Sequence, residues 1–288
     1  MTFSSVLALA APAERMPAVG WVYAALVFAG ILVSVIVLIR AQRLTSVPAP
    51  QPLPPSPLSP RAAAALLALL FVLHALQAVL LPWIAPNGVD SALGGFLLVV
   101  QSLLFHGVAI GFVAVAIVRA RRNPFEALGI TPSRWVRNAG LGLVFYLIAL
   151  PHVVLYGMIS QWLLSRFGVE GDLQPVMQWL SAEQPTWLRF YLIGLGVIVA
   201  PIVEEILFRG IALPLLVRRM GVAPAVVTVS MVFAVIHFHV PSLVPLFLIG
   251  AAFSLAYLRT RDLTVPILMH AVFNLVNIGL MLYLEGTP

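Results

Sequence analysis

Cysteine and lysine are both missing from this 288-residue chain, and charged residues of any kind are scarce. Without cysteine the chain has no disulfide, no thiolate metal site and no cysteine nucleophile. Only 9% of the residues are charged, whereas 61% are hydrophobic. Soluble domains are typically about one quarter charged and about half apolar. The composition therefore excludes an ordinary soluble domain and indicates a membrane protein.

The positive charge comes entirely from arginine and gives a formal net charge of +6. A nucleic-acid-binding surface would need these charges on one solvated face. They lie instead between long apolar runs, so we expect a lipid bilayer and no nucleic acid as the chain's environment. Arginine in the loops is a signal of membrane topology.

Eight apolar runs, most of them long enough to cross a bilayer with about 20 residues, follow one another along the sequence. They predict an all-α fold, a polytopic transmembrane helical bundle of about eight spans. The runs cover residues 19–39, 62–84, 92–118, 139–164, 188–217, 222–239, 241–258 and 263–284.

The segments between the runs have distinct compositions. Residues 47–60 contain seven prolines and predict an extended linker. Residues 165–187 are acidic and aromatic, which favours an interfacial loop or short helix. Residues 1–12 end in an Ala-x-Ala-like pattern without a preceding basic region, so we expect no cleaved signal peptide.

The arginine-rich loops follow the first, third, fifth and seventh runs. The positive-inside rule places these loops in the cytoplasm and both chain ends outside. Arginine as the sole basic residue favours a bacterial source, so we expect a multi-pass protein of the bacterial plasma (inner) membrane.

Two carboxylates lie inside an apolar run, although a charge at mid-span costs roughly 2.5–3.5 kcal/mol. They are Glu204 and Glu205, in the sequence PIVEEILFRG. Neighbouring helical residues point about 100° apart. Glu205 and Arg209 are four residues apart and can pair on one face. The spacing therefore predicts a structural Glu205–Arg209 pair and leaves Glu204 for chemistry, unless the group is only an ion cluster at a helix end.

Polar residues on two later runs repeat the spacing of four: Phe233 with His237, and His270 with Asn274. Such residues can simply join helices by hydrogen bonds. Counted from the arginine-rich ends at about 1.5 Å per residue, however, Glu204, His237, His270 and Asn274 reach overlapping depths, roughly 12–24 Å along their helices. Their common depth favours one site.

One carboxylate, two imidazoles and one amide suit the activation of water. Glu204 and His237 can activate the water, and His270 and Asn274 can stabilise an oxyanion. The alternative is a Zn²⁺ ion held by Glu204, His237 and His270. The compact zinc motif H-E-x-x-H is absent, and the residues by themselves leave both mechanisms open. The motif G-x-S-x-G and a mid-span aspartate are absent too, which argues against serine and aspartyl intramembrane proteases.

The three patterns E-E-x-x-x-R, F-x-x-x-H and H-x-x-x-N, in this order in apolar helices, closely resemble the CAAX protease and bacteriocin-processing (CPBP, or Abi) family. The stretch FEALGI at residues 125–130 also looks like the family's sequence before its core. The resemblance covers residues 123–284. It implies an intramembrane endopeptidase that acts on membrane-associated peptides or proteins, prenylated or bacteriocin-like ones among them. The family includes members described as metalloproteases and members described as glutamate-type and metal-free, and we prefer the metal-free type over one that uses Zn²⁺.

The resemblance also assigns roles that agree with the residue-based reading. Glu204 and His237 activate water, His270 and Asn274 stabilise the oxyanion, and Glu205, Arg209 and Phe233 support the site. It predicts three parts: an N-terminal transmembrane anchor with its Pro-rich linker (residues 1–61), two further transmembrane helices (62–122) and a catalytic core (123–288). The alternatives are a non-catalytic scaffold or bacteriocin-immunity factor on the same fold, and a transporter with a Glu/His proton relay.

Overall fold

The computed structural model describes residues 18–42, 53–84, 92–169, 174–181 and 185–285. Within these ranges all regular secondary structure is helical, which confirms the expected all-α fold class. The long helices are α2 (Ala18–Gln42), α3 (Pro60–Ile84), α4 (Ala92–Arg119), α6 (Trp135–Arg166), α11 (Val222–Val235), α12 (Leu243–Thr260) and α13 (Thr264–Glu285). Short elements are α5 (Pro124–Leu128), η3 (Pro132–Arg134), α7 (Pro175–Ser181) and η6 (Val240–Ser242).

The fifth apolar run forms one continuous helical segment of five parts. These parts are α8 (Thr186–Gly194), η4 (Leu195–Val199), α9 (Ala200–Glu205), η5 (Ile206–Ala212) and α10 (Leu213–Met220). Pro201 lies inside this segment without ending it, because the turn before it widens to hydrogen bonds between residues five apart, and the helix axis continues.

In the described part of the chain, six helical segments are long and apolar enough to cross a membrane. Two shorter apolar helices, Pro60–Leu76 and Val222–Val235, occupy the other two expected runs. Every expected run is therefore helical, and the protein is a multi-pass membrane protein. A helix satisfies all its backbone hydrogen bonds internally, which is why lipid selects this structure.

The prediction of a sixth span over residues 222–239 is wrong at its end, because the helix is shorter than predicted. Helix α11 ends at Val235, and residues 236–239 form turns in which Phe238 has a φ of 48°. A 14-residue helix is about 21 Å long, so α11 ends inside the membrane. Irregular backbone at that depth is tolerated where protein or a water-filled cavity surrounds it.

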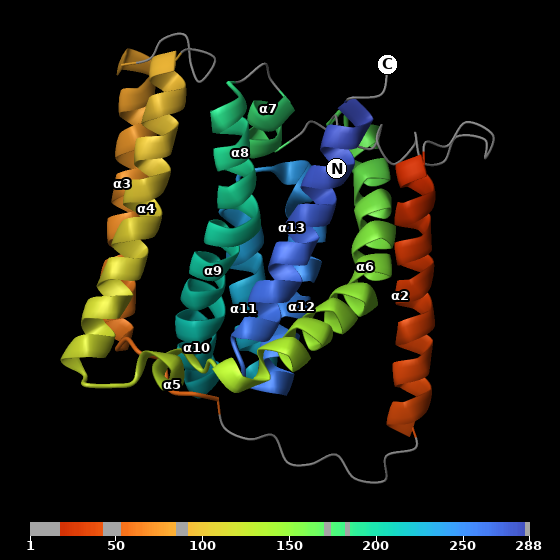
Figure 1. Ribbon diagram of the computed structural model, residues 1–288, viewed down its shortest axis with the longest axis horizontal. Coiled ribbons are helices and arrows are strands. Elements are labelled where there is room, and N and C mark those ends of the chain that lie inside the picture. Colours follow the sequence, from red (N-terminus) through yellow and green to blue (C-terminus); the bar gives the residue numbers. More distant parts are fainter. Residues whose placement is uncertain (1–17, 43–52, 85–91, 170–173, 182–184, 286–288) are drawn as a thin grey trace.

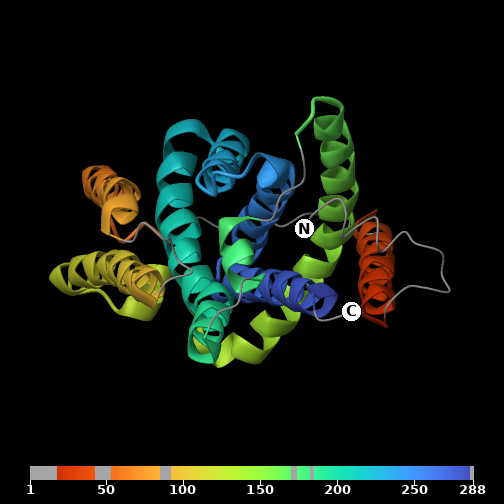
Figure 2. The ribbon, with the colours of Figure 1, turned by 90° about the horizontal axis from the view of Figure 1, so that it is seen from above.

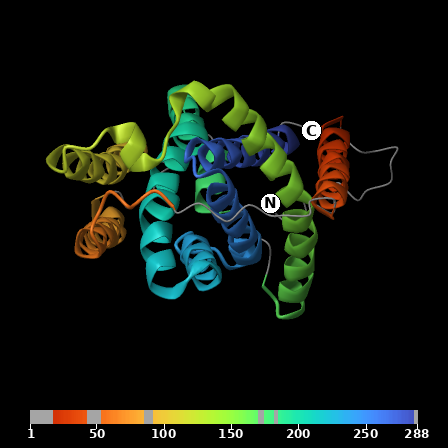
Figure 3. The same ribbon diagram turned by 90° about the horizontal axis from the view of Figure 1, so that it is seen from below.

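The helices form a core with two flanking parts (Figure 1). Helices α6, α11, α12 and α13 pack together, and α2 lies along the outer side of α6. Helices α3 and α4 pair on the opposite side, and α4 also contacts α9 (Figures 2 and 3). The segment α8–α10 thus lies between the α3–α4 pair and the core.

The arginine-rich ends gather on one side of the molecule. The last turns of α2, α4, α10 and α12 each carry arginine, and these ends lie at the bottom of Figure 1 together with α5. Helix α7, from the acidic segment, lies at the opposite end. The short helix expected in residues 165–187 is thereby confirmed, while residues 170–173 and 182–184 lie outside the described residues.

The stretch FEALGI forms α5 and docks on the loop before α13. The side chain of Asn123 caps α5 by accepting from the Phe125 N–H at 2.9 Å, and Gly129 ends it with a φ of 64°. The Gly129 carbonyl accepts from the Leu263 N–H at 2.9 Å. This contact fixes the start of α13, which carries His270.

Two expectations concern residues that are wholly or partly undescribed. The N-terminal stretch 1–12 lies outside the described residues. Of the Pro-rich linker, residues 53–59 are described and are not helical, as predicted.

Candidate active site

A widened helical turn precedes the two glutamates. The Ala200 N–H bonds to the Leu195 carbonyl, five residues back. By the same pattern residue 201 would bond to the Gly196 carbonyl, but Pro201 has no N–H. The Asn274 side chain of α13 supplies the missing donor, with Nδ2 2.7 Å from the Gly196 oxygen. Such wide turns inside helices are frequent at functional sites.

Glu205 is the centre of a fully buried polar cluster. Its Oε1 accepts from Arg209 Nη1 at 2.8 Å and from His270 Nδ1 at 2.9 Å. Both Glu205 and Arg209 are 0% exposed. The predicted structural pair is therefore present, and it also holds the imidazole of His270, which the sequence did not predict.

The remaining donors of Arg209 bind helix α12. Nη2 donates to the Gly250 carbonyl at 2.7 Å, and Nε donates to Ser254 Oγ at 3.4 Å. Sequence analysis missed Gly250 and Ser254. They are two small residues four positions apart on an apolar helix. This pattern is typical of close helix packing and is the signal that could have identified them.

Three phenylalanine rings enclose the Arg209 guanidinium. Its carbon lies 5.7, 5.0 and 5.1 Å from the ring centres of Phe208, Phe233 and Phe253. Phe253 also stacks on His270 at 4.7 Å, and Phe233 contacts His237 at 5.0 Å. Cation–π contacts gain strength where water is absent. Phe233 thus links the buried cluster to both histidines.

Glu204 points away from this cluster. Its side chain is 23% exposed, and its Oε2 lies 3.8 Å from His270 Nε2, too far for a direct hydrogen bond. Oε2 is a buried oxygen without a hydrogen-bond partner. A buried carboxylate oxygen is costly without a donor. Water or a substrate group is needed to satisfy it.

His237 lies just beyond the end of α11. Its Nδ1 is 2.7 Å from the Phe233 carbonyl, and a carbonyl can only accept, so Nδ1 carries the proton. In the neutral ring, Nε2 is then the acceptor. The early end of α11 places this imidazole on a turn at membrane depth.

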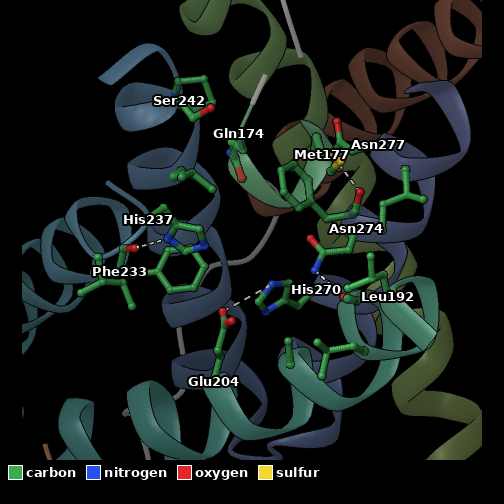
Figure 4. Close-up of a pocket in the computed structure, with 18 of the residues that line it drawn as sticks. Gln174, Met177, Leu192, Glu204, Phe233, His237, Ser242, His270, Asn274 and Asn277 are labelled. Carbon is green, nitrogen blue, oxygen red and sulfur yellow. Dashed lines mark hydrogen bonds and ion pairs between the residues drawn. The ribbon is translucent and has the colours of Figure 1, made fainter. Parts of the chain in front are cut away.

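The predicted residues meet at one cavity. Its volume is about 630 Å³, and its walls come from α2, α3, α4, α6, α7, α8, η4, α9, α11, η6, α12 and α13. Figure 4 shows Glu204, His237, His270 and Asn274 around this space. Glu204, Phe233, His237, His270 and Asn274 all line it, while Glu205 and Arg209 lie behind it.

The zinc alternative requires three ligands close together. Among the described residues, no three His, Cys, Asp or Glu side chains lie close enough together to hold a metal ion. Glu204, His237 and His270 line the same cavity but do not form a three-ligand site as arranged here.

Comparison with known proteins finds a similarity over the segment that carries this site. Residues 185–276 match the family model described as "Type II CAAX prenyl endopeptidase Rce1-like". All seven predicted site residues fall within the matched segment. No solved structure matches the chain.

Two relatives match parts of the chain. Human "CAAX prenyl protease 2" is 33% identical over 108 residues, which are 31% of this chain and 31% of that protein. "Putative membrane peptidase YdiL" of Bacillus subtilis (strain 168) is 28% identical over 156 residues, 51% of this chain and 62% of that protein. Both relatives are thus matched over less than two thirds of their length.

Proposed function

We propose that the protein is an intramembrane endopeptidase of the CAAX protease (CPBP) family, since residues 185–276 match a model of that family. It hydrolyses a peptide bond of a membrane-associated peptide or protein. The observation that carries the proposal is the Glu204 carboxylate. It faces a cavity with an unsatisfied buried oxygen, beside His237 and His270, in the middle of a 35-residue membrane-spanning helix.

Glu204 is the proposed general base. A water molecule in the cavity donates one hydrogen bond to Glu204 and the other to His237 Nε2. Glu204 takes a proton from this water, and the hydroxide oxygen attacks the carbonyl carbon of the substrate. General-base catalysis by a positioned carboxylate contributes about 10²–10⁴-fold.

His270 and Asn274 are the proposed oxyanion donors. Glu205 accepts from His270 Nδ1, so Nε2 is the ring nitrogen on the cavity side, and an N–H at this position donates to the oxyanion. One N–H of the Asn274 amide is bonded to Gly196, and the second N–H remains for the substrate. Donors placed for the transition state are a large catalytic contribution.

The proton from water completes the reaction. Protonated Glu204 donates it to the amine nitrogen as the C–N bond breaks, and the new carboxyl group loses the second proton of the water. Glu205, Arg209 and Phe233 act by holding His270 and His237 in position. No substrate atom needs to touch these three residues.

The organisation of the chain is part of the proposal. Residues 123–288 form the catalytic core, 1–61 an anchor with its linker, and 62–122 two further transmembrane helices. The arginine-rich face lies in the cytoplasm of a bacterial cell, and the protein resides in the plasma membrane. Prenylated and bacteriocin-like peptides are the substrate classes to test first.

The test compares the Glu204→Gln variant with wild type in lipid nanodiscs. Both proteins are incubated with farnesylated and unmodified peptides, and new termini are identified by mass spectrometry. We expect Glu204→Gln to lose at least about 100-fold in cleavage rate. Glu126→Gln, an exposed carboxylate on α5, is the matched control and keeps full activity. Equal cleavage by wild type and Glu204→Gln would rule the proposal out and favour a non-catalytic scaffold.

Metal analysis of the purified protein separates the two mechanisms. The Glu204→Gln and His270→Ala variants are analysed beside wild type. A stoichiometric metal that both variants lose would make these residues ligands and would require a rearranged site. Full cleavage activity of a sample stripped by chelator supports the water mechanism above.

A further inference from the structure

Helix α4 contributes a polar face to the cavity, although it lies outside the segment that matches the family model. Gln101, Ser102, Phe105 and His106 line the cavity from two successive turns of α4. The neighbouring residues Leu103 and Leu104 are more than half exposed and have the apolar character expected for lipid contact. Polar residues on one face of a membrane helix, aimed at a cavity, are a mark of function.

The depth of this face follows from two contacts that α4 makes. Ser102 is hydrogen-bonded to the hydroxyl of Tyr191 on α8. Further down, Ala109 and Val113 pack in one buried cluster with Val203, the residue next to Glu204. His106 is four residues after Ser102 and three before Ala109, about 6 and 4.5 Å along the helix. It therefore lies between the levels of Tyr191 and Glu204.

The protonation of His106 is determined by its own helix. Nδ1 lies 2.6 Å from the Ser102 carbonyl, so Nδ1 is the donor and Nε2 of the neutral ring is an acceptor. His106 is half-buried, and its imidazole lines the cavity. An acceptor at this place suits a donor of the substrate, and a peptide in the membrane must find partners for its backbone N–H groups.

We propose that the Gln101–His106 face of α4 is the peptide-binding wall of the active site. It binds the extended backbone of the substrate beside the scissile bond, and His106 Nε2 accepts a hydrogen bond from a peptide N–H. This inference rests on the proposed peptidase function. It gives the helices before residue 123 a role in substrate selection, while the chemistry stays with the C-terminal core.

The chain offers a matched control on α6. His152 also places Nδ1 at hydrogen-bond distance, 3.0 Å, from the carbonyl four residues back. Unlike His106, it is exposed and is not among the residues that line the cavity. Replacing either histidine by leucine therefore removes the same local hydrogen bond, and only His106→Leu removes a cavity acceptor.

The kinetic test uses peptides that wild type cleaves in nanodiscs. We expect His106→Leu to raise KM about tenfold with kcat unchanged, because it removes a contact made equally in the ground and transition states. His106→Gln, which keeps an acceptor, restores part of the affinity, and His152→Leu behaves as wild type. An unchanged KM in a folded His106→Leu protein would overturn the proposal.

A binding test keeps the inference separate from the proposed chemistry. Glu204→Gln protein is irradiated with short apolar peptides that carry a benzophenone side chain, and the crosslinked segment is identified by mass spectrometry. We expect crosslinks to α4 residues 101–106. Crosslinks at α4 without any cleavage by wild type would contradict the proposed peptidase function but would still support α4 as the peptide-binding wall. Crosslinks confined to other helices would overturn the proposal that α4 binds the peptide.

Discussion

At the residue scale, two adjacent glutamates have opposite environments. Glu205 is fully buried and bonded to Arg209 and His270, whereas Glu204 is partly exposed and lines the cavity. The difference follows from helix geometry, since neighbouring residues point about 100° apart. Glu205 is thus tied to its neighbours, and Glu204 is the carboxylate that we propose for the chemistry.

This contrast predicts different stability effects for the same substitution. Glu205→Gln leaves the Arg209 charge buried without its counter-ion, which costs about 3–5 kcal/mol. Glu204→Gln removes a partly exposed carboxylate whose contact with His270 Nε2 is a distant 3.8 Å, and its effect on stability is small. Thermal unfolding in detergent measures both. A Glu205→Gln protein as stable as Glu204→Gln would show that the ion pair contributes no stability.

The Asn274 side chain on α13 replaces the backbone N–H that Pro201 lacks, and so connects α13 to the segment α8–α10. Asn274→Ala leaves the Gly196 carbonyl without this donor and costs about 1–3 kcal/mol. Pro201→Ala restores an N–H that can reach the same carbonyl. We therefore expect the double variant to be more stable than Asn274→Ala alone. If the loss of stability in the double variant equalled the sum of the losses in the two single variants, the coupling between Asn274 and Pro201 would be contradicted.

At the element scale, α11 and α12 approach closely at Gly250. A Cβ on this glycine would lie 3.1 Å from Phe233 Cδ1 and 3.5 Å from Arg209 Nη2. The small residue lets Arg209 reach the Gly250 carbonyl and lets Phe233 pack beneath His237. The position of His237 thus depends on the packing of these two helices.

Gly250→Ala should therefore disturb both stability and activity. Overpacking costs about 1–3 kcal/mol, and the shift of Phe233 moves His237, so kcat falls as well. Gly279→Ala on α13 is the control, because a Cβ there meets no heavy atom within 4 Å. Thermal unfolding and cleavage rates are measured on both. A wild-type unfolding temperature and cleavage rate for Gly250→Ala would show that α11 and α12 can move apart without loss of stability or activity.

At the scale of the whole molecule, the arginine-rich helix ends share one face (Figure 1). The positive-inside rule predicts that this face is cytoplasmic. The segment Thr186–Met220 crosses the whole protein, so its two ends report on both sides. The lack of cysteine gives a labelling experiment no background.

Single cysteines at the two ends of this segment test the orientation. We expect Trp187→Cys to react with a membrane-impermeant maleimide in intact cells. Arg219→Cys should react only after the membrane is permeabilised. Both positions are exposed, so access is set by the membrane. The reverse labelling pattern would invert the orientation.

The sequence by itself determined the fold class, the runs that become helices and the pairing of Glu205 with Arg209. These features depend on hydropathy and on spacing along one helix, which are local properties. Only the tertiary structure decided that α11 ends at Val235, that His270 binds Glu205 and that Asn274 bonds to Gly196. Each of these depends on contacts between segments distant in the chain, and such contacts leave no periodic pattern. The place of α4 at the cavity is of the same kind, because only packing against α8 and α9 brings His106 to the cavity that Glu204 also lines.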